Sequence, residues 1–275
     1  MENVKIFLKN LLAKTTSENI LFKRNLLKEY LQIIVLDFIY SQPKYSNLIF
    51  YGGSCLSHCF GLPRLSEDLD FVDIENEIKI SELAKDLENY FIKNTDLNLV
   101  TSSQKFRIYL KFPILYELNI AKEKEESNLI FLKIEAYKKF DFCKNYRIEI
   151  IPLFKFNKSV LIRTFDLSTL MSTKIRAILY RKWEKTDKNG RVLIKVKGRD
   201  YFDLMWYFEK GIKPNIDCIE DVENIDDLRE KLLEIVNKID SRSIQLDLEP
   251  LIENETYIIN LSKNIKEILL RQLSI

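Results

Sequence analysis

Apolar residues in the first half of the chain recur at two alternating spacings. Some segments have apolar residues at helical spacing, and others have the short continuous or alternating runs typical of strands. In chain order, these patterns predict a helix over 20–40, a strand over 48–51, a helix over 54–60, a strand over 69–74 and a helix over 78–94. Three further strands are predicted over 106–112, 129–137 and 146–153. Ser81 is a candidate cap for the helix over 78–94. The order predicts a small mixed sheet with helices packed on it.

From Leu167 onward the apolar residues recur at helical spacing only. Helices are predicted over 167–182, 200–209, 226–239 and 257–273. We therefore expect an α/β (α+β) fold in two parts. An α/β domain covers residues 1–163, with helices at its N-terminal end, and a mostly helical domain covers residues 164–275.

The composition is that of a globular protein, with 46% hydrophobic and 31% charged residues in a chain of 275. No apolar run approaches the ~18 residues of a membrane span, and residues 1–10 lack a signal-peptide pattern. We therefore expect a cytoplasmic protein with no membrane partner. The net charge of +2 hides a basic segment over 181–199, with eight basic and two acidic residues. This segment is either a polyanion-binding patch or a solvated loop.

The cysteines and the single histidine exclude several kinds of chemistry. Cys55, Cys59, Cys143 and Cys218 form no C-x-x-C pair, so we expect free thiols and not a disulfide framework. His58 is flanked by two of them, but a fourth ligand at metal-site spacing is missing, and a packed helix is the expected explanation. One histidine also disfavours Ser-His-Asp and Cys-His catalysis. Catalysis must therefore depend on carboxylates, lysines and arginines.

The segment Tyr51–Asp73 carries the strongest chemical signal. Gly52 and Gly53 stand where a strand turns into a helix, and there the backbone N–H groups and the helix N-terminus can hold a phosphate. Asp68 and Asp70 begin the next strand two residues apart, so their carboxylates project from the same face. A divalent cation such as Mg²⁺ relieves the repulsion between such a pair. A solvated polar turn is the alternative.

A third carboxylate on a neighbouring strand would complete a metal site. Glu135, at the end of an apolar strand, is the first candidate, and Glu149 is the second. Together with Asp68 and Asp70, either residue would be suited to a two-metal site that acts on phosphate oxygens.

The chain resembles the AbiEii/AbiGii nucleotidyltransferase toxins in four motifs. These are the Gly-Gly-Ser turn, the run Leu-Ser-Glu-Asp-Leu-Asp-Phe, the helical Lys174, and Arg199-Asp200-x-x-Asp203, in this order between residues 21 and 211. The family belongs to the DNA-polymerase-β-like enzymes of abortive-infection and type IV toxin–antitoxin systems. The resemblance implies a nucleotidyltransferase-like mixed sheet, followed by a helical half that completes the nucleotide and acceptor cleft.

The resemblance also implies a role for each matching residue. It suggests nucleotide binding by Gly53, Ser54, Arg64, Lys174, Arg181 and Asp200; catalysis by Asp68, Asp70, Lys174 and Asp203; and Mg²⁺ binding by Asp68, Asp70 and Glu135. Simpler roles stay open for some of them. Lys174 is also consistent with a surface lysine, Asp200 with a helix cap, and Arg181 with an ion pair to Asp200.

The implied activity is Mg²⁺-dependent transfer of a nucleoside monophosphate from a nucleoside triphosphate (NTP) to an acceptor. The acceptor implied by the family is the 3′ end of tRNA or another RNA, and the partner is a separately encoded antitoxin. Three alternatives remain: nucleotide transfer to a protein hydroxyl, transfer of the γ-phosphate to a small acceptor, and a non-catalytic nucleotide-binding interaction module.

Overall fold

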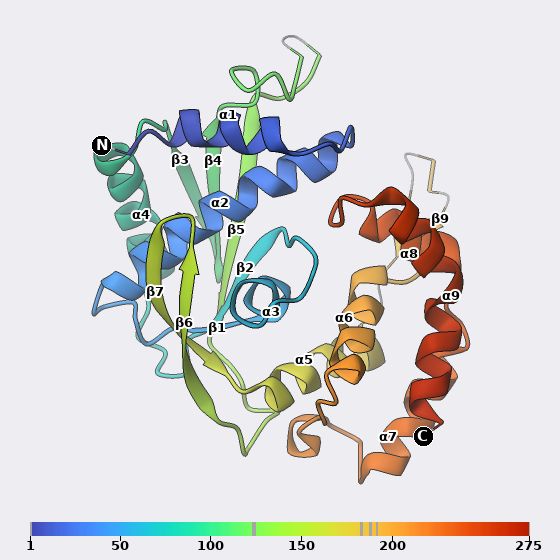
Figure 1. Ribbon diagram of the computed structural model, residues 1–275. Coiled ribbons are helices and arrows are strands. Elements are labelled where there is room, and N and C mark those ends of the chain that lie inside the picture. The colour runs from blue at the N-terminus through green and yellow to red at the C-terminus, as the bar shows by residue number, and fades with distance from the viewer. Residues whose placement is uncertain (1, 123–124, 182–183, 187–188, 191, 275) are drawn as a thin grey trace. The chain divides into compact units, whose positions relative to one another are not determined.

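The computed structural model describes residues 2–122, 125–181, 184–186, 189–190 and 192–274 (Figure 1). The chain divides into two compact units. The first contains the residues up to Phe140 together with Ile148–Thr164. The second contains Asp141–Arg147 and the residues from Phe165 onward.

The first unit is a seven-stranded mixed sheet with helices, as the sequence predicts. Its strands are ordered β3-β4-β5-β2-β1-β7-β6. Its elements are α1 Val4–Lys14, α2 Ile20–Ser41, β1 Ile49–Tyr51, α3 Gly52–Phe60, β2 Asp68–Val72, α4 Ile80–Asn94, β3 Val100–Gln104, β4 Arg107–Pro113, β5 Leu129–Tyr137, β6 Ile148–Lys155 and β7 Lys158–Phe165. Helix α2 lies across the sheet with α1 packed against it (Figure 1).

Strands β3 and β7 were not predicted, and each has a physical reason. Strand β3 reads Val-Thr-Ser-Ser-Gln and is largely exposed, so it lacks an apolar pattern. Strand β7 follows β6 through a tight turn in which Phe156 and Asn157 both have positive φ, a conformation that the sequence does not announce there. The Ser81 cap is also wrong: α4 begins at Ile80 after Lys79, and no side chain caps it.

The second unit is mostly helical, also as expected. Its elements are α5 Leu167–Tyr180, β8 Lys185–Thr186, β9 Val192–Ile194, α6 Gly198–Glu209, the 3₁₀ turn η1 Ile216–Cys218, α7 Ile225–Val236, α8 Ser241–Leu248 and α9 Glu255–Leu273. The helix predicted over 167–182 ends at Tyr180, and residue 182 lies outside the described residues. Helix α8 was missed because it has only eight residues.

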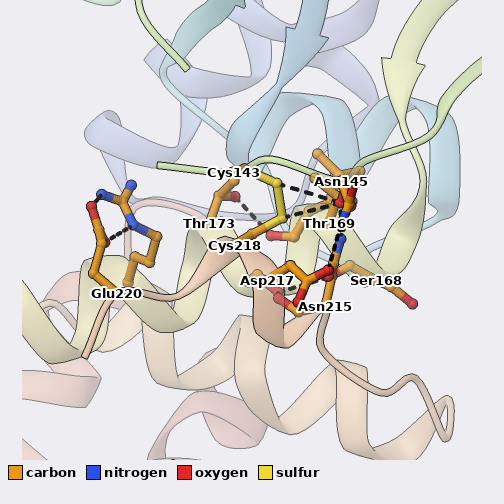
Figure 2. Close-up of a disulfide and its surroundings, with 12 residues drawn as sticks. Cys143, Asn145, Ser168, Thr169, Thr173, Asn215, Asp217, Cys218 and Glu220 are labelled. Atoms are coloured by element: carbon orange, nitrogen blue, oxygen red, sulfur yellow. Dashed lines mark hydrogen bonds and ion pairs between the residues drawn. A yellow bond between two sulfur atoms is a disulfide. The ribbon is translucent and has the colours of Figure 1, made fainter. Parts of the chain in front are cut away.

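A disulfide within the second unit corrects the expectation of free thiols (Figure 2). Cys143 and Cys218 are bonded, whereas Cys55 and Cys59 are free. Asn145 supports the link, because its side-chain amide donates to Asp217 at 2.9 Å. The partners are 75 residues apart, so no local cysteine motif could reveal the pairing.

The described residues contain no helix that is long and apolar enough to span a membrane.

Candidate functional site

Strand β2 presents the two aspartates of the motif on one face of the sheet. Its apolar residues Leu69 and Phe71 are fully buried, whereas Asp68 and Asp70 remain partly accessible on the opposite face. This alternation is the two-residue period of a strand that is buried on one side. Strand β1 pairs antiparallel to β2 and places Tyr51 opposite Asp70. The glycine turn that follows Tyr51 is therefore beside the aspartates.

The glycine turn is in direct contact with the β2 carboxylates. Gly52 has a φ of +80°, and a Cβ atom there would lie 2.7 Å from Oδ2 of Asp70. Only glycine permits both the backbone conformation and this close approach. Helix α3 begins at Gly52, and no side chain caps it. Its first N–H groups lack partners within the helix and can receive an anion next to Asp70.

Ser54 and Arg64 connect the turn to the loop before β2. The hydroxyl of the buried Ser54 donates to the backbone carbonyl of Asp68. Arg64 is also buried, and its Nη1 donates to the carbonyl of Leu65 at 2.8 Å. A Cβ atom at Gly53 would lie 2.7 Å from Nη2 of Arg64. The structure therefore places Gly53, Ser54 and Arg64 close together. The Ser54 hydroxyl is already hydrogen-bonded to the carbonyl of Asp68.

His58 supports this region from inside the unit. Its Nε2 is 2.9 Å from Oε1 of Gln32, and the Gln32 amide nitrogen donates to the carbonyl of Ser66 at 2.9 Å. Because the Gln32 oxygen only accepts, Nε2 of His58 carries the proton. Burial lowers the pKa of His58 to about 3. The histidine therefore holds α3, α2 and the β2 approach together as a neutral group, away from the chemistry.

Glu135 stands beside Asp70, and Glu149 does not. The parallel pairing of β2 with β5 places Asp70 opposite Glu135 and Asp68 opposite Lys133. Glu149 belongs to β6, which β1 and β7 separate from β2. Of the two candidates for a third carboxylate, only Glu135 therefore adjoins the aspartates.

Two cations hold Glu135. Its Oε1 accepts from Nε of Arg107 at 2.5 Å, and its Oε2 lies 2.9 Å from Nζ of Lys133. The same ammonium lies 2.9 Å from Oδ2 of Asp68. We call Lys133, Asp68 and Glu135 the strand cluster. Neither cation was predicted from the sequence, although the alternation in β4 and β5 places both on the face of the acidic residues.

The charges of the strand cluster reinforce one another. Burial alone would lower the pKa of Lys133, but Asp68 and Glu135 raise it above its ordinary value. Burial would raise the pKa of Glu135, but Lys133 and Arg107 lower it. Nearby Tyr137 has a pKa of about 12, raised by burial and then by the charges of Glu135 and Asp70. At neutral pH the carboxylate is therefore ionised and the lysine is charged.

Asp68 and Asp70 fit a divalent cation, although one oxygen of Asp68 contacts Lys133, whereas both oxygens of Glu135 are engaged. Two carboxylates on one strand face, next to the glycine turn, supply the oxygen ligands that Mg²⁺ uses. Within the described residues, no three His, Cys, Asp or Glu side chains form a group suited to a metal ion. Both oxygens of Glu135 contact cations. Metal binding by Glu135 stays a prediction, and these contacts weigh against it.

The second unit contains a similar arrangement on α5 and α6. Nζ of Lys174 lies 3.2 Å from Oδ1 of Asp200 and 2.7 Å from Oδ2 of Asp203. We call these residues the helix cluster. Because Asp200 and Asp203 are three residues apart, one face of α6 presents both to the lysine. Asp200 lies inside α6, which begins at Gly198, and is not its N-cap. Lys174 is buried and is therefore not a surface lysine.

A basic pocket adjoins the helix cluster within the second unit. It has a volume of about 570 Å³. It is lined by Ala177, Ile178, Arg181, Glu184, Lys195, Val196, Lys197, Asp200 and Tyr201. Nη1 of Arg181 lies 3.4 Å from Oδ2 of Asp200, so the ion pair considered from the sequence is present. Residues 182–183, 187–188 and 191 of the basic segment lie outside the described residues.

Lys197 lines the pocket although no motif in the sequence singles it out. Burial lowers its pKa to about 8, Asp200 opposes this shift, and the cations nearby add to it. Burial raises the pKa of Asp200, but Lys174, Lys197 and Arg181 lower it overall. The pocket therefore combines the cations Arg181, Lys195 and Lys197 with the carboxylates Glu184 and Asp200. Its partly desolvated positive charge is suited to a phosphate or another anion.

Comparison with known proteins defines the class. The family described as nucleotidyl transferase AbiEii toxin, type IV TA system, matches residues 36–258. The chain therefore belongs to the AbiEii family of nucleotidyltransferase toxins. It is a nucleotidyltransferase, and type IV toxin–antitoxin membership implies an antitoxin partner.

Solved structures extend the comparison. MenT4, a nucleotidyltransferase toxin from Mycobacterium tuberculosis, is similar over 98% of this chain and 88% of its own, with 11% identity and a TM-score of 0.56. This likeness shows the shared fold. JHP933 from Helicobacter pylori matches over 91% of this chain and 93% of its own, with 16% identity and a TM-score of 0.47, too low to support an argument. Among curated protein sequences, none matches.

Proposed function

We propose that the chain transfers a nucleoside monophosphate from an NTP to the 3′ end of an RNA, with tRNA as the acceptor that the family suggests. The observation that carries the proposal is the contact between the Gly52 turn and Asp70, where Gly52 leaves room for the carboxylate. A phosphate-binding turn and a carboxylate pair for a divalent ion thus adjoin each other. Nucleotidyl transfer needs both.

The residues of the first unit bind and orient the triphosphate. The N-terminal N–H groups of α3, from Gly52 onward, donate to phosphate oxygens. The buried Arg64 packs against Gly53 and supports the turn. Asp68 and Asp70 would hold Mg²⁺, which would supply Lewis acidity toward the phosphate oxygens. An acceptor hydroxyl oxygen forms a bond to the α-phosphorus, the bond from this phosphorus to the α,β-bridging oxygen breaks, and pyrophosphate leaves. The hydroxyl proton passes to solvent.

The second unit supplies a pocket that binds anions and a lysine whose ammonium is fixed by two aspartates. Arg181, Lys195 and Lys197 line the basic pocket and contact phosphates of the RNA or the nucleotide. Asp200 and Asp203 hold the ammonium of Lys174 at a fixed position. We propose that this fixed charge assists nucleotide binding, and that Asp203 positions the group.

The test uses NTPs labelled at the α-phosphate, one base at a time, with Mg²⁺ and total tRNA. Label on RNA with wild type, and none with Asp70→Asn, is the expected result. Label on the chain or on another protein would indicate protein nucleotidylation instead. Transfer of γ-label with release of a nucleoside diphosphate would indicate a phosphotransferase. No transfer to any acceptor would favour a binding module.

A further inference from the structure

We propose that Lys133 is a built-in cation of the carboxylate site and takes the place of a second divalent ion. The inference rests on the proposed nucleotidyl transfer and specifies how its site is charged. Asp68 and Asp70 then bind a single divalent ion together with the nucleotide. Glu135 holds the lysine and does not bind metal.

The sheet itself sets the position of the lysine. Asp68 is the direct neighbour of Lys133 in the parallel β2–β5 ladder, and Glu135 is two residues further along β5 on the same face. A lysine at this position therefore projects between the two carboxylates. Its Nζ lies 2.9 Å from an oxygen of each. The contact follows from strand register and not from a chance surface rotamer.

The state of Glu135 supports the same inference. Its side chain is 8% exposed, and its two oxygens contact two different cations, Arg107 at 2.5 Å and Lys133 at 2.9 Å. A metal ion at Glu135 would have to displace at least one of them. Charge compensation at Glu135 is thus complete without a metal.

Lys133 has the properties that a resident cation needs. Its side chain is 27% exposed, so the charge is accessible from the face that carries Asp68 and Asp70. An ammonium has three donors, and the two carboxylates accept from two directions, so one donor remains for an incoming oxygen. We expect that oxygen to belong to the acceptor hydroxyl or the α-phosphate. Lys133 is therefore a positioning and charge-compensating residue of the reaction.

The test counts Mn²⁺ ions bound per chain by equilibrium dialysis, with a saturating NTP analogue that cannot be cleaved between the α- and β-phosphates. We expect one ion in wild type and in Lys133→Arg, which keeps the charge. We expect two in Lys133→Met, because the space and the carboxylates become available. Arg107→Gln is the matched control, since it also removes a cation from Glu135 but none from Asp68, and it should bind one. Circular dichroism confirms folding of each variant.

Two ions in wild type, or one in the folded Lys133→Met chain, would overturn the proposal. Transfer rates provide a second readout. Lys133→Met should lose about a hundredfold in rate at low Mn²⁺ and recover at high Mn²⁺, whereas a purely structural lysine would show no metal rescue. If wild type transfers no nucleotide to any acceptor, the proposed function fails, and the ion count still decides the role of Lys133.

Discussion

The strand cluster of the first unit and the helix cluster of the second unit each place a lysine between two carboxylates, but the two clusters differ in accessibility. In the strand cluster the side chains of Lys133 and Asp68 are 27% and 35% exposed, and that of Glu135 is 8% exposed. In the helix cluster the side chains of Lys174 and Asp203 are 11% and 0% exposed. Partly hydrated charges can exchange partners with an incoming nucleotide and metal ion, whereas buried charges cannot lose a partner without a large cost. We therefore expect the same residue types to serve chemistry in one unit and mainly fixed architecture in the other.

The largest effect is expected on catalysis from the strand cluster. Asp68→Asn should lower the rate of nucleotide transfer by about a thousandfold, because the divalent ion loses a ligand. The free energy of unfolding should change by less than about 1 kcal/mol, since the lost ion pair is partly hydrated. Rate assays and urea denaturation of the same preparation check both. A large loss of stability would show that Asp68 has a structural role like that of the helix cluster.

The next effect is expected on stability from the helix cluster. Lys174→Met leaves Asp200 and Asp203 buried next to each other without their shared cation, and should lower the free energy of unfolding by about 3–5 kcal/mol. Lys133→Met is the matched comparison. Its loss should be no more than about 1 kcal/mol, because Asp68 is partly exposed and Glu135 keeps its contact with Arg107. Urea denaturation measures both variants. Equal losses would remove the distinction between the two clusters.

A smaller effect is expected at the turn beside the strand cluster. Gly52→Ala places a methyl group against Asp70 at a positive φ, whereas Gly61→Ala has a similar φ of +76° and open space. The backbone strain should cost about 1–2 kcal/mol in both. Only Gly52→Ala should also reduce nucleotide transfer. Thermal unfolding and transfer assays provide the comparison, and equal activity in both variants would contradict the close contact.

An effect that appears only as the pH falls is expected from His58, which connects α3 through Gln32 to the loop before β2. Its folded pKa of about 3 is below the ordinary value of 6.5. The unfolded chain therefore binds the extra proton first, and stability is lost as the pH falls from about 6.5 toward 3. For this residue the loss between pH 7 and pH 5 is about 2 kcal/mol.

The control variant is His58→Gln, which retains a polar side chain but cannot take up the proton. Urea denaturation at pH 7 and pH 5 measures the difference between the two chains. Wild type should lose more stability than the variant over this interval. Parallel losses in the two would show that His58 does not titrate in this range.

The sequence supported most of the fold because its signals are local. The Gly52 turn, the aspartates of β2 and the helices α5 and α6 each carry a motif or a periodic pattern within about twenty residues. The polar strand β3, the tight turn before β7 and the disulfide between Cys143 and Cys218 do not. These depend on packing or on contacts far apart in the chain, which one sequence does not display.

The candidate site was predictable in part, for the residues that stand out within one segment of the sequence. The carboxylates and Lys174 stood out because charges are unusual in apolar runs. Lys133 and Arg107 did not, because alternating lysines and arginines are ordinary on an exposed strand face. Their meaning depends on the β2–β5 and β4–β5 registers, which pair Lys133 with Asp68 and Arg107 with Glu135. Strand register between distant segments is not readable from one chain.

The most direct measurement is an anomalous difference map from crystals grown with Mn²⁺ and the same NTP analogue. The account predicts one Mn²⁺ peak, at Asp68 and Asp70, with Lys133 still in contact with Glu135 and no peak at the helix cluster. A metal ion bound by Glu135, or by Asp200 and Asp203, would contradict it.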